Sequence, residues 1–156
     1  LSEKIKSMKQ FITIIFLGIT TTLFSQQDYY NTKKGYVAQG YDVVAYFNNT
    51  AIKGDKKFTT KHNGVKLKFS SKKNLELFNA NPTKYLPQYG GYCAYAIGKN
   101  GEKVSINPKT YEIRDGKLYL FYNAWGTNTL KLWKKEGAIA LKKQADKNWE
   151  KFRSKK

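Results

Sequence analysis

The alternation of apolar and polar residues around Asn63-Gly64 predicts a β-hairpin. Residues 58–62 and 65–69 both alternate, which is typical of strands with one buried face. Asn-Gly between them suits the positive φ angles of a tight turn. A continuous apolar run over residues 43–47 is rich in β-branched and aromatic side chains, and it predicts a further, buried strand.

A second hairpin and two helices are predicted in the C-terminal half. Residues 111–114 and 118–121 flank the turn sequence Asp-Gly-Lys. Residues 127–135 and 138–152 predict helices, and in the second of them apolar residues recur at steps of three and four. This spacing produces one apolar stripe with lysines on the opposite side. The stripe consists of Ala138, Leu141, Ala145, Trp149 and Phe152.

Short helices are predicted between the hairpins from their start signals. Ser70-Ser71 is a helix cap, and Asn81-Pro82 combines a cap with a proline in the first turn. The segment 92–97 fits either a strand or a helix. Hairpins interleaved with short helices predict an α+β fold: a small antiparallel sheet of hairpins, short helices packed on it, and a C-terminal helical segment.

The N-terminal residues carry the pattern of an export signal. Lysines precede an apolar run over residues 11–24, which is shorter than a membrane span requires, and Ser25 offers a small residue for cleavage. We therefore expect a periplasmic or extracellular protein. Residues 1–7 precede Met8, the only methionine, so whether they are native stays open. The expected division is a signal peptide over 1–25, a flexible N-terminus over 26–35 and a single domain over 36–153.

The charge of the chain favours anionic partners. The 29 lysines and arginines outnumber the 11 acidic residues and give a formal net charge of +18. Most of the basic residues are lysines scattered in pairs, and Arg114 and Arg153 are the only arginines. Specific readers of nucleic acid depend on arginine for contacts to guanine. We therefore expect a lysine-rich solvated surface, no nucleic-acid partner, and an anionic envelope surface as the partner class that the charge favours.

Four segments together carry a family resemblance. They are residues 40–47, which read Gly-Tyr-Asp-Val-Val-Ala-Tyr-Phe, residues 64–71, residues 82–94 and residues 115–120. In order, these segments resemble the opening motif, the hairpin-to-helix segment, the signature stretch and the tail of exported bacterial YHS-domain proteins. The resemblance covers about residues 36–152, and it implies a small α+β domain related to modules of metal-handling proteins.

The resemblance also implies a role in binding copper or another soft metal ion. Ser70 stands where the metal modules carry a cysteine, and serine is a poor ligand for a soft metal. Cys93 is the only cysteine, so it is the only thiolate candidate. Cu(I) accepts few ligands, and we consider His62 and Asp42 as accessory ligands beside Cys93. The ordinary alternatives are a cysteine that only packs in the core and a histidine that faces solvent near a turn.

Enzyme activity is not expected. The chain has no Cys-x-x-Cys pair for disulfide exchange, no phosphate loop, no dinucleotide fingerprint and no His-Glu-x-x-His motif. We therefore predict no catalytic residue. The alternative to metal binding is a non-catalytic interaction module that binds an anionic or small ligand through its aromatic and basic surface. The tyrosines predicted to line such a site are Tyr41, Tyr89, Tyr92 and Tyr95.

Overall fold

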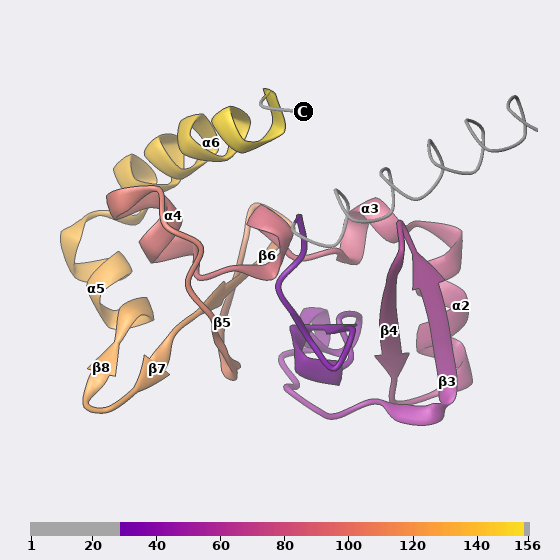
Figure 1. Ribbon diagram of the computed structural model, residues 1–156. Helices are drawn as coiled ribbons and strands as arrows, with labels where there is room; N and C mark the ends of the chain where they lie inside the picture. The colour runs from indigo at the N-terminus through magenta and orange to yellow at the C-terminus, as the bar shows by residue number, and fades with distance from the viewer. Residues whose placement is uncertain (1–28, 155–156) are drawn as a thin grey trace, which may run out of the picture.

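The computed structural model describes residues 29–154 and shows an α+β fold, as predicted (Figure 1). The predicted signal peptide lies outside the described residues. In the described part of the chain, none of the helices has the length and hydrophobicity of a membrane span. Strands and short helices alternate first, and two helices, α5 (Thr129–Glu136) and α6 (Ala138–Ser154), follow at the C-terminal end.

A four-stranded sheet occupies the N-terminal half. Its strands are, in spatial order, β1 (Thr32–Lys33), β2 (Tyr36–Val37), β4 (Val65–Phe69) and β3 (Asp55–His62). The hairpin β3–β4 is the predicted one, and its turn residues Asn63 and Gly64 have φ angles of 47° and 79°. The pairing of β2 with β4 is parallel, whereas the other two pairings are antiparallel.

Two capped helices follow the hairpin, and their start signals are confirmed. The Ser71 side chain accepts a hydrogen bond from the Asn74 N–H (3.1 Å) at the start of α2 (Lys72–Ala80). The Asn81 side chain accepts one from the Lys84 N–H (3.3 Å) at the start of α3 (Pro82–Tyr85). Figure 1 shows α2 alongside the β3–β4 hairpin. Buried Phe78 anchors α2 to the sheet.

The strand predicted over residues 43–47 is wrong. The backbone instead bends into the short 3-10 helix η2 (Ala45–Asn48). The cause is Asp42, whose Oδ1 accepts hydrogen bonds from the N–H groups of Val44 (2.9 Å) and Ala45 (3.2 Å). An aspartate that binds the backbone two and three residues ahead turns the chain and offers these groups an alternative to strand pairing. The burial implied by the apolar run is correct, since Val43, Val44 and Tyr46 are buried.

The segment expected to be flexible, residues 26–35, has regular structure and burial in the part that the structure describes. Residues 29–35 include β1 and the buried side chain of Tyr30. Asn31 attaches this segment to a distant loop, because its backbone N–H donates to the Gly90 carbonyl (2.8 Å) and its side chain donates to the Gly91 carbonyl (3.0 Å). This anchoring uses contacts about 60 residues away, which local polarity does not reveal.

The C-terminal half contains the second predicted hairpin and three helices. Its elements before α5 are η3 (Gln88–Gly91), α4 (Ala94–Asn100), β5 (Asn107–Arg114), β6 (Lys117–Phe121), β7 (Asn123–Ala124) and β8 (Thr127–Asn128). The segment that fitted either a strand or a helix is therefore helical from Ala94 onwards. The predicted stripe on α6 is buried through Ala138, Ala145 and Trp149. Helix α4 packs so closely on α6 that a Cβ atom on Gly98 would lie 2.6 Å from the Leu141 carbonyl oxygen.

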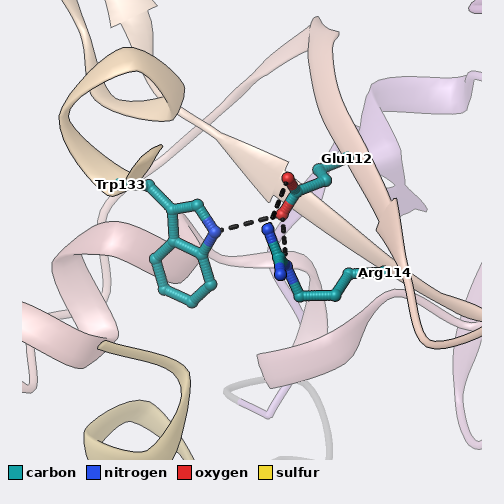
Figure 2. Close-up of polar contacts among 3 residues, drawn as sticks. All are labelled: Glu112, Arg114 and Trp133. Carbon is teal, nitrogen blue, oxygen red and sulfur yellow. Dashed lines mark hydrogen bonds and ion pairs between the residues drawn. The ribbon is translucent and has the colours of Figure 1, made fainter. Parts of the chain in front are cut away.

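A polar cluster attaches α5 to the second hairpin. Figure 2 shows Glu112 and Arg114 of β5 beside Trp133 of α5. The Glu112 carboxylate accepts two hydrogen bonds from Arg114, both 3.0 Å long, and one from the Trp133 indole N–H (3.1 Å). The hydrogen bond with Glu112 raises the pKa of Arg114. Because Trp133 is fully buried, this cluster satisfies the one polar atom of an otherwise apolar side chain.

Candidate functional site

A broad basic cleft of about 1010 Å³ lies between the N-terminal sheet and the start of β5. Six lysines line it, together with tyrosine, asparagine and glutamine side chains, and no acidic residue does. We call it the lysine cleft. Its lining residues are Lys33, Lys34, Tyr36, Gln39, Tyr41, Lys53, Lys56, Lys68, Ile106, Asn107, Pro108, Lys109 and Asn123.

The six lysines reach the cleft from separate parts of the fold. Lys33 and Lys34 belong to β1 and its turn, Lys53 precedes β3, and Lys109 comes from β5. Lys56 and Lys68 stand on the β3–β4 hairpin. Only Lys33 and Lys34 are consecutive in the sequence. The parallel pairing of β2 with β4 and the hydrogen bond from Gln39 of η1 (Ala38–Gly40) to Ile106, the residue before β5, bring them together.

Hydrogen bonds between distant segments hold the two walls of the cleft in place. The Gln39 side chain donates to the Ile106 carbonyl (2.7 Å), and the Tyr46 hydroxyl donates to the Pro108 carbonyl (2.6 Å). On the far wall, the Asn107 side chain donates to the carbonyl of Asn123 (3.2 Å). The cleft is therefore formed by the fold itself and is ready to receive a ligand without rearrangement of its walls.

The cleft lysines of the described chain form no ion pairs with its carboxylates. In residues 29–154, none of the six lysine ammonium groups lies within 4.0 Å of a carboxylate. Lys68 is held over the ring of Tyr36, with its ammonium nitrogen 4.1 Å from the ring centre, and Lys66 approaches the same ring at 4.6 Å. A cation–π contact restrains a flexible lysine without neutralising it. The arrangement can attract and bind a group of negative charges.

The structure encloses Cys93, the residue singled out from the sequence. Its side chain is fully buried, with Sγ 3.3 Å from the Thr129 hydroxyl, and Sγ accepts a hydrogen bond from the Tyr122 N–H (3.4 Å). Cys93 is also the residue that precedes helix α4, and its backbone N–H donates to the Val104 carbonyl. In the described part of the chain, its side chain contacts hydroxyl, amide and apolar groups, which are not ligands that complete a soft-metal site.

Asp42 and His62 do not join Cys93. The Asp42 side chain accepts five hydrogen bonds, all from the protein, three of them from Ser70 and Asn74. The His62 ring packs edge-on against Phe78, with the ring centres 5.8 Å apart. Among residues 29–154, no three His, Cys, Asp or Glu side chains lie together as a metal site would need. A soft-metal role for Cys93 therefore stays a prediction from the sequence.

Of the four predicted ligand-binding tyrosines, Tyr89, Tyr92 and Tyr95 belong to one hydrophobic cluster around Trp149, and Tyr41 lies apart from them. Only Tyr41 lines the lysine cleft. The Tyr89 hydroxyl donates to Asp146 (2.8 Å). Burial, and to a smaller extent this hydrogen bond, raises the pKa of Tyr89 well above the ordinary value. The Tyr95 hydroxyl donates to Glu136 (2.9 Å), and the Tyr92 ring lies 6.2 Å from that of Trp149.

Tyr89 and His62 line a second, smaller cavity of about 520 Å³, which is separate from the lysine cleft. Its wall includes the acidic side chains of Asp146 and Glu150 and the ring of Trp149. Tyr89 already uses its hydroxyl within this wall. The cavity thus combines aromatic rings with mixed charges, and it lacks the single sign of charge that distinguishes the lysine cleft.

Comparisons with models of known protein families, with curated proteins and with solved structures found no match. The resemblance to exported YHS-domain proteins therefore stays a prediction, as does export. The lysine cleft is the site that sequence reasoning missed. The signal was present as lysine pairs, two of which, Lys33-Lys34 and Lys56-Lys57, contribute to the cleft, but the sequence does not show which pairs face one another.

Proposed function

We propose that this protein is a non-catalytic binding module for a ligand that carries several negative charges, such as phosphate, sulfate or carboxylate groups. The observation that carries the proposal is the collection of six lysines around one cleft with no acidic side chain among its lining residues. Clefts lined by one sign of charge concentrate counter-charged ligands and accelerate their association. This proposal develops the interaction-module alternative predicted from the sequence.

The composition of the cleft favours a ligand with several charges over a single small anion. A pair of unit charges at 4 Å gains only about 1 kcal/mol in bulk water and about 4 kcal/mol near a protein surface. Five of the six lysines are exposed, so their attraction to any one charge is weakened by solvent and salt. A ligand that contacts several lysines at once adds these small gains. Gln39, Asn107 and Tyr41 supply polar groups that orient it.

The experiment is calorimetric titration of the protein with inorganic triphosphate and, in parallel, with a sulfated tetrasaccharide. The test variant carries Lys53→Gln, Lys56→Gln and Lys68→Gln. Two exposed charges and the half-buried one of Lys68, at roughly 0.5–1 kcal/mol each, predict an affinity lower by about tenfold to a hundredfold. Salt should weaken binding by the wild-type protein more steeply than binding by this variant.

A matched control removes the same amount of charge elsewhere. Lys73, Lys143 and Lys147 are exposed residues of α2 and α6 that do not line the cleft. Their replacement by glutamine should change the affinity by less than about threefold, since only the long-range field of the protein is reduced. If the cleft variant and the control variant lose affinity equally, binding depends on net charge alone, and the lysine cleft is not the site.

A further inference from the structure

Trp125 is 96% exposed at the tip of the β7–β8 hairpin. It occupies the turn together with Gly126, and both residues have positive φ angles, 53° and 76°. The other two tryptophans behave conventionally, because Trp133 is fully buried and Trp149 is 7% exposed. The hairpin extends outward from the body of the fold in Figure 1.

The fold itself gives no reason for an indole at this position. Within residues 29–154, Trp125 makes no side-chain hydrogen bond and no ring contact. Two-residue hairpin turns with positive φ at both positions favour Asn-Gly or Gly-Gly, and a bulky side chain in this conformation is unfavourable. The exposure of a large apolar side chain and an uncommon backbone conformation therefore coincide at one residue. The backbone conformation, and not the exposure alone, makes Trp125 a candidate for contact with another molecule.

The hairpin continues directly from the lysine cleft. Asn123, the first residue of β7, lines the cleft, and its carbonyl accepts the hydrogen bond from the Asn107 side chain of β5. In Figure 1 the tip of the β7–β8 hairpin and the segment that leads into β3 both reach the lower edge of the molecule. On the other side of the hairpin, α5 carries exposed lysines. They are Lys131, Lys134 and Lys135.

We propose that the β7–β8 hairpin inserts Trp125 into the interfacial region of an anionic lipid bilayer while the lysines of the cleft contact the lipid headgroups. Tryptophan is enriched at membrane interfaces because its ring has an apolar body and one polar atom. Anionic headgroups attract nearby lysines, and an apolar anchor together with a basic surface provides two binding signals. The inference rests on the proposed function for the charge, and it names the bilayer as the source of the anionic groups.

A bilayer fits these observations better than a protein partner does. Specific protein interfaces bury on the order of 1,000 Å² or more around an apolar centre. The neighbours of Trp125 in the hairpin, Asn123, Gly126 and Thr127, are small or polar and do not extend an apolar patch. One protruding indole among lysines supplies the anchor that an interfacial insertion needs, and no more.

The experiment compares vesicle binding with binding of a soluble anion. Wild-type protein is mixed with vesicles of phosphatidylglycerol and phosphatidylcholine, with vesicles of phosphatidylcholine alone, and with inorganic triphosphate. The test variant is Trp125→Asn, because asparagine tolerates the positive φ angle and keeps the hairpin folded. The control is Ile139→Asn, which removes another exposed apolar side chain (80% exposed) from α6.

We expect wild-type protein to bind the anionic vesicles with a blue shift of tryptophan fluorescence, and to bind the neutral vesicles far more weakly. Trp125→Asn should bind the anionic vesicles about tenfold or more weakly and without the shift, and it should bind triphosphate like the wild type. Ile139→Asn should resemble the wild type in every arm.

The outcomes separate the two proposals. Vesicle binding that is equal in wild type and Trp125→Asn, or absent while triphosphate binds, overturns the membrane inference and leaves the lysine cleft as the proposed site. Vesicle binding that depends on Trp125 in a protein that does not bind triphosphate supports the membrane inference and removes the cleft as a site for soluble anions. If a soluble protein shields Trp125 from solvent and anionic vesicles do not, the membrane inference is also overturned.

Discussion

Replacement of Asp42 by asparagine should destabilise the fold strongly, although it changes one atom. Asp42 is fully buried, and its carboxylate joins three segments of the chain. Its Oδ1 accepts from the N–H groups of Val44 and Ala45. Its Oδ2 accepts from the backbone N–H of Ser70 (2.7 Å), from the Ser70 hydroxyl (2.6 Å) and from the Asn74 amide (2.8 Å). The carboxylate thus connects the start of η2, the end of β4 and the start of α2.

The magnitude follows from the donors that the amide leaves without an acceptor. In its better orientation, the asparagine oxygen keeps the three bonds at the Oδ2 position, and its NH₂ group faces the N–H groups of Val44 and Ala45. Each buried N–H without an acceptor costs about 1–3 kcal/mol, so the loss is about 2–6 kcal/mol. Removal of a buried charge recovers part of this, which places the expected loss at about 2–4 kcal/mol. A domain of this size has only about 5–15 kcal/mol in total.

The assay is urea unfolding followed by the fluorescence of the buried tryptophans. Asp55→Asn is the matched control, because Asp55 is exposed and its side chain accepts one hydrogen bond, from the Lys57 N–H (2.8 Å). The control should change the free energy of unfolding by less than about 0.5 kcal/mol. If Asp42→Asn loses less than about 1 kcal/mol, or no more than the control, the carboxylate does not hold these three segments together.

Three further predictions concern packing, pH and the thiol. Gly98→Ala should lower the melting temperature, because the added Cβ would meet the Leu141 carbonyl oxygen at 2.6 Å. This overlap costs about 1–3 kcal/mol, which exceeds the gain from the higher helix propensity of alanine. A higher melting temperature would contradict the close packing of α4 on α6. Burial raises the pKa of three core tyrosines, Tyr46, Tyr89 and Tyr119, above the ordinary 10.0. The unfolded chain therefore ionises first, and the free energy of unfolding should fall by about 4 kcal/mol per pH unit as the pH rises above 10.0. The part of the phenolate absorbance that comes from these three of the 12 tyrosines should therefore appear in one step with loss of the fold, and its appearance while the protein stays folded would refute this. Because Cys93 is fully buried, it should react with a thiol reagent only after denaturation, and rapid reaction of the native protein would show that the thiol is accessible. Equal Cu(I) affinity of the wild type and Cys93→Ala would remove Cys93 from any metal site.

The sequence predicted elements whose signals are local. Asn63-Gly64 adopts the positive φ angles that a tight turn requires, and the hairpin around it forms. Ser71 and Asn81 cap the helices that follow them. In each case the preference arises from backbone geometry or from a side chain that binds its own neighbours, so a few residues carry the information.

The predictions failed where a distant or competing contact decided the conformation. Residues 43–47 are apolar enough for a strand, but Asp42 binds the backbone beside them and bends it. Asn31 holds a polar N-terminal segment in place through carbonyl groups of Gly90 and Gly91. The sequence left open whether Cys93 is accessible, since an unusual residue type says nothing about whether packing closes over it, and the structure shows the side chain buried.

The amino-acid sequence by itself determined the α+β class, the hairpins, the capped helices and the large positive charge. Only the tertiary structure decided where that charge is concentrated. Lysines at positions 33 to 109 converge because β2 pairs with β4 and because Gln39 of η1 binds Ile106, the residue before β5. Electrostatic attraction depends on distance in space, which is set by pairing and packing between segments far apart in the chain. The same pattern of lysines on another fold would form a dispersed solvated surface with no cleft.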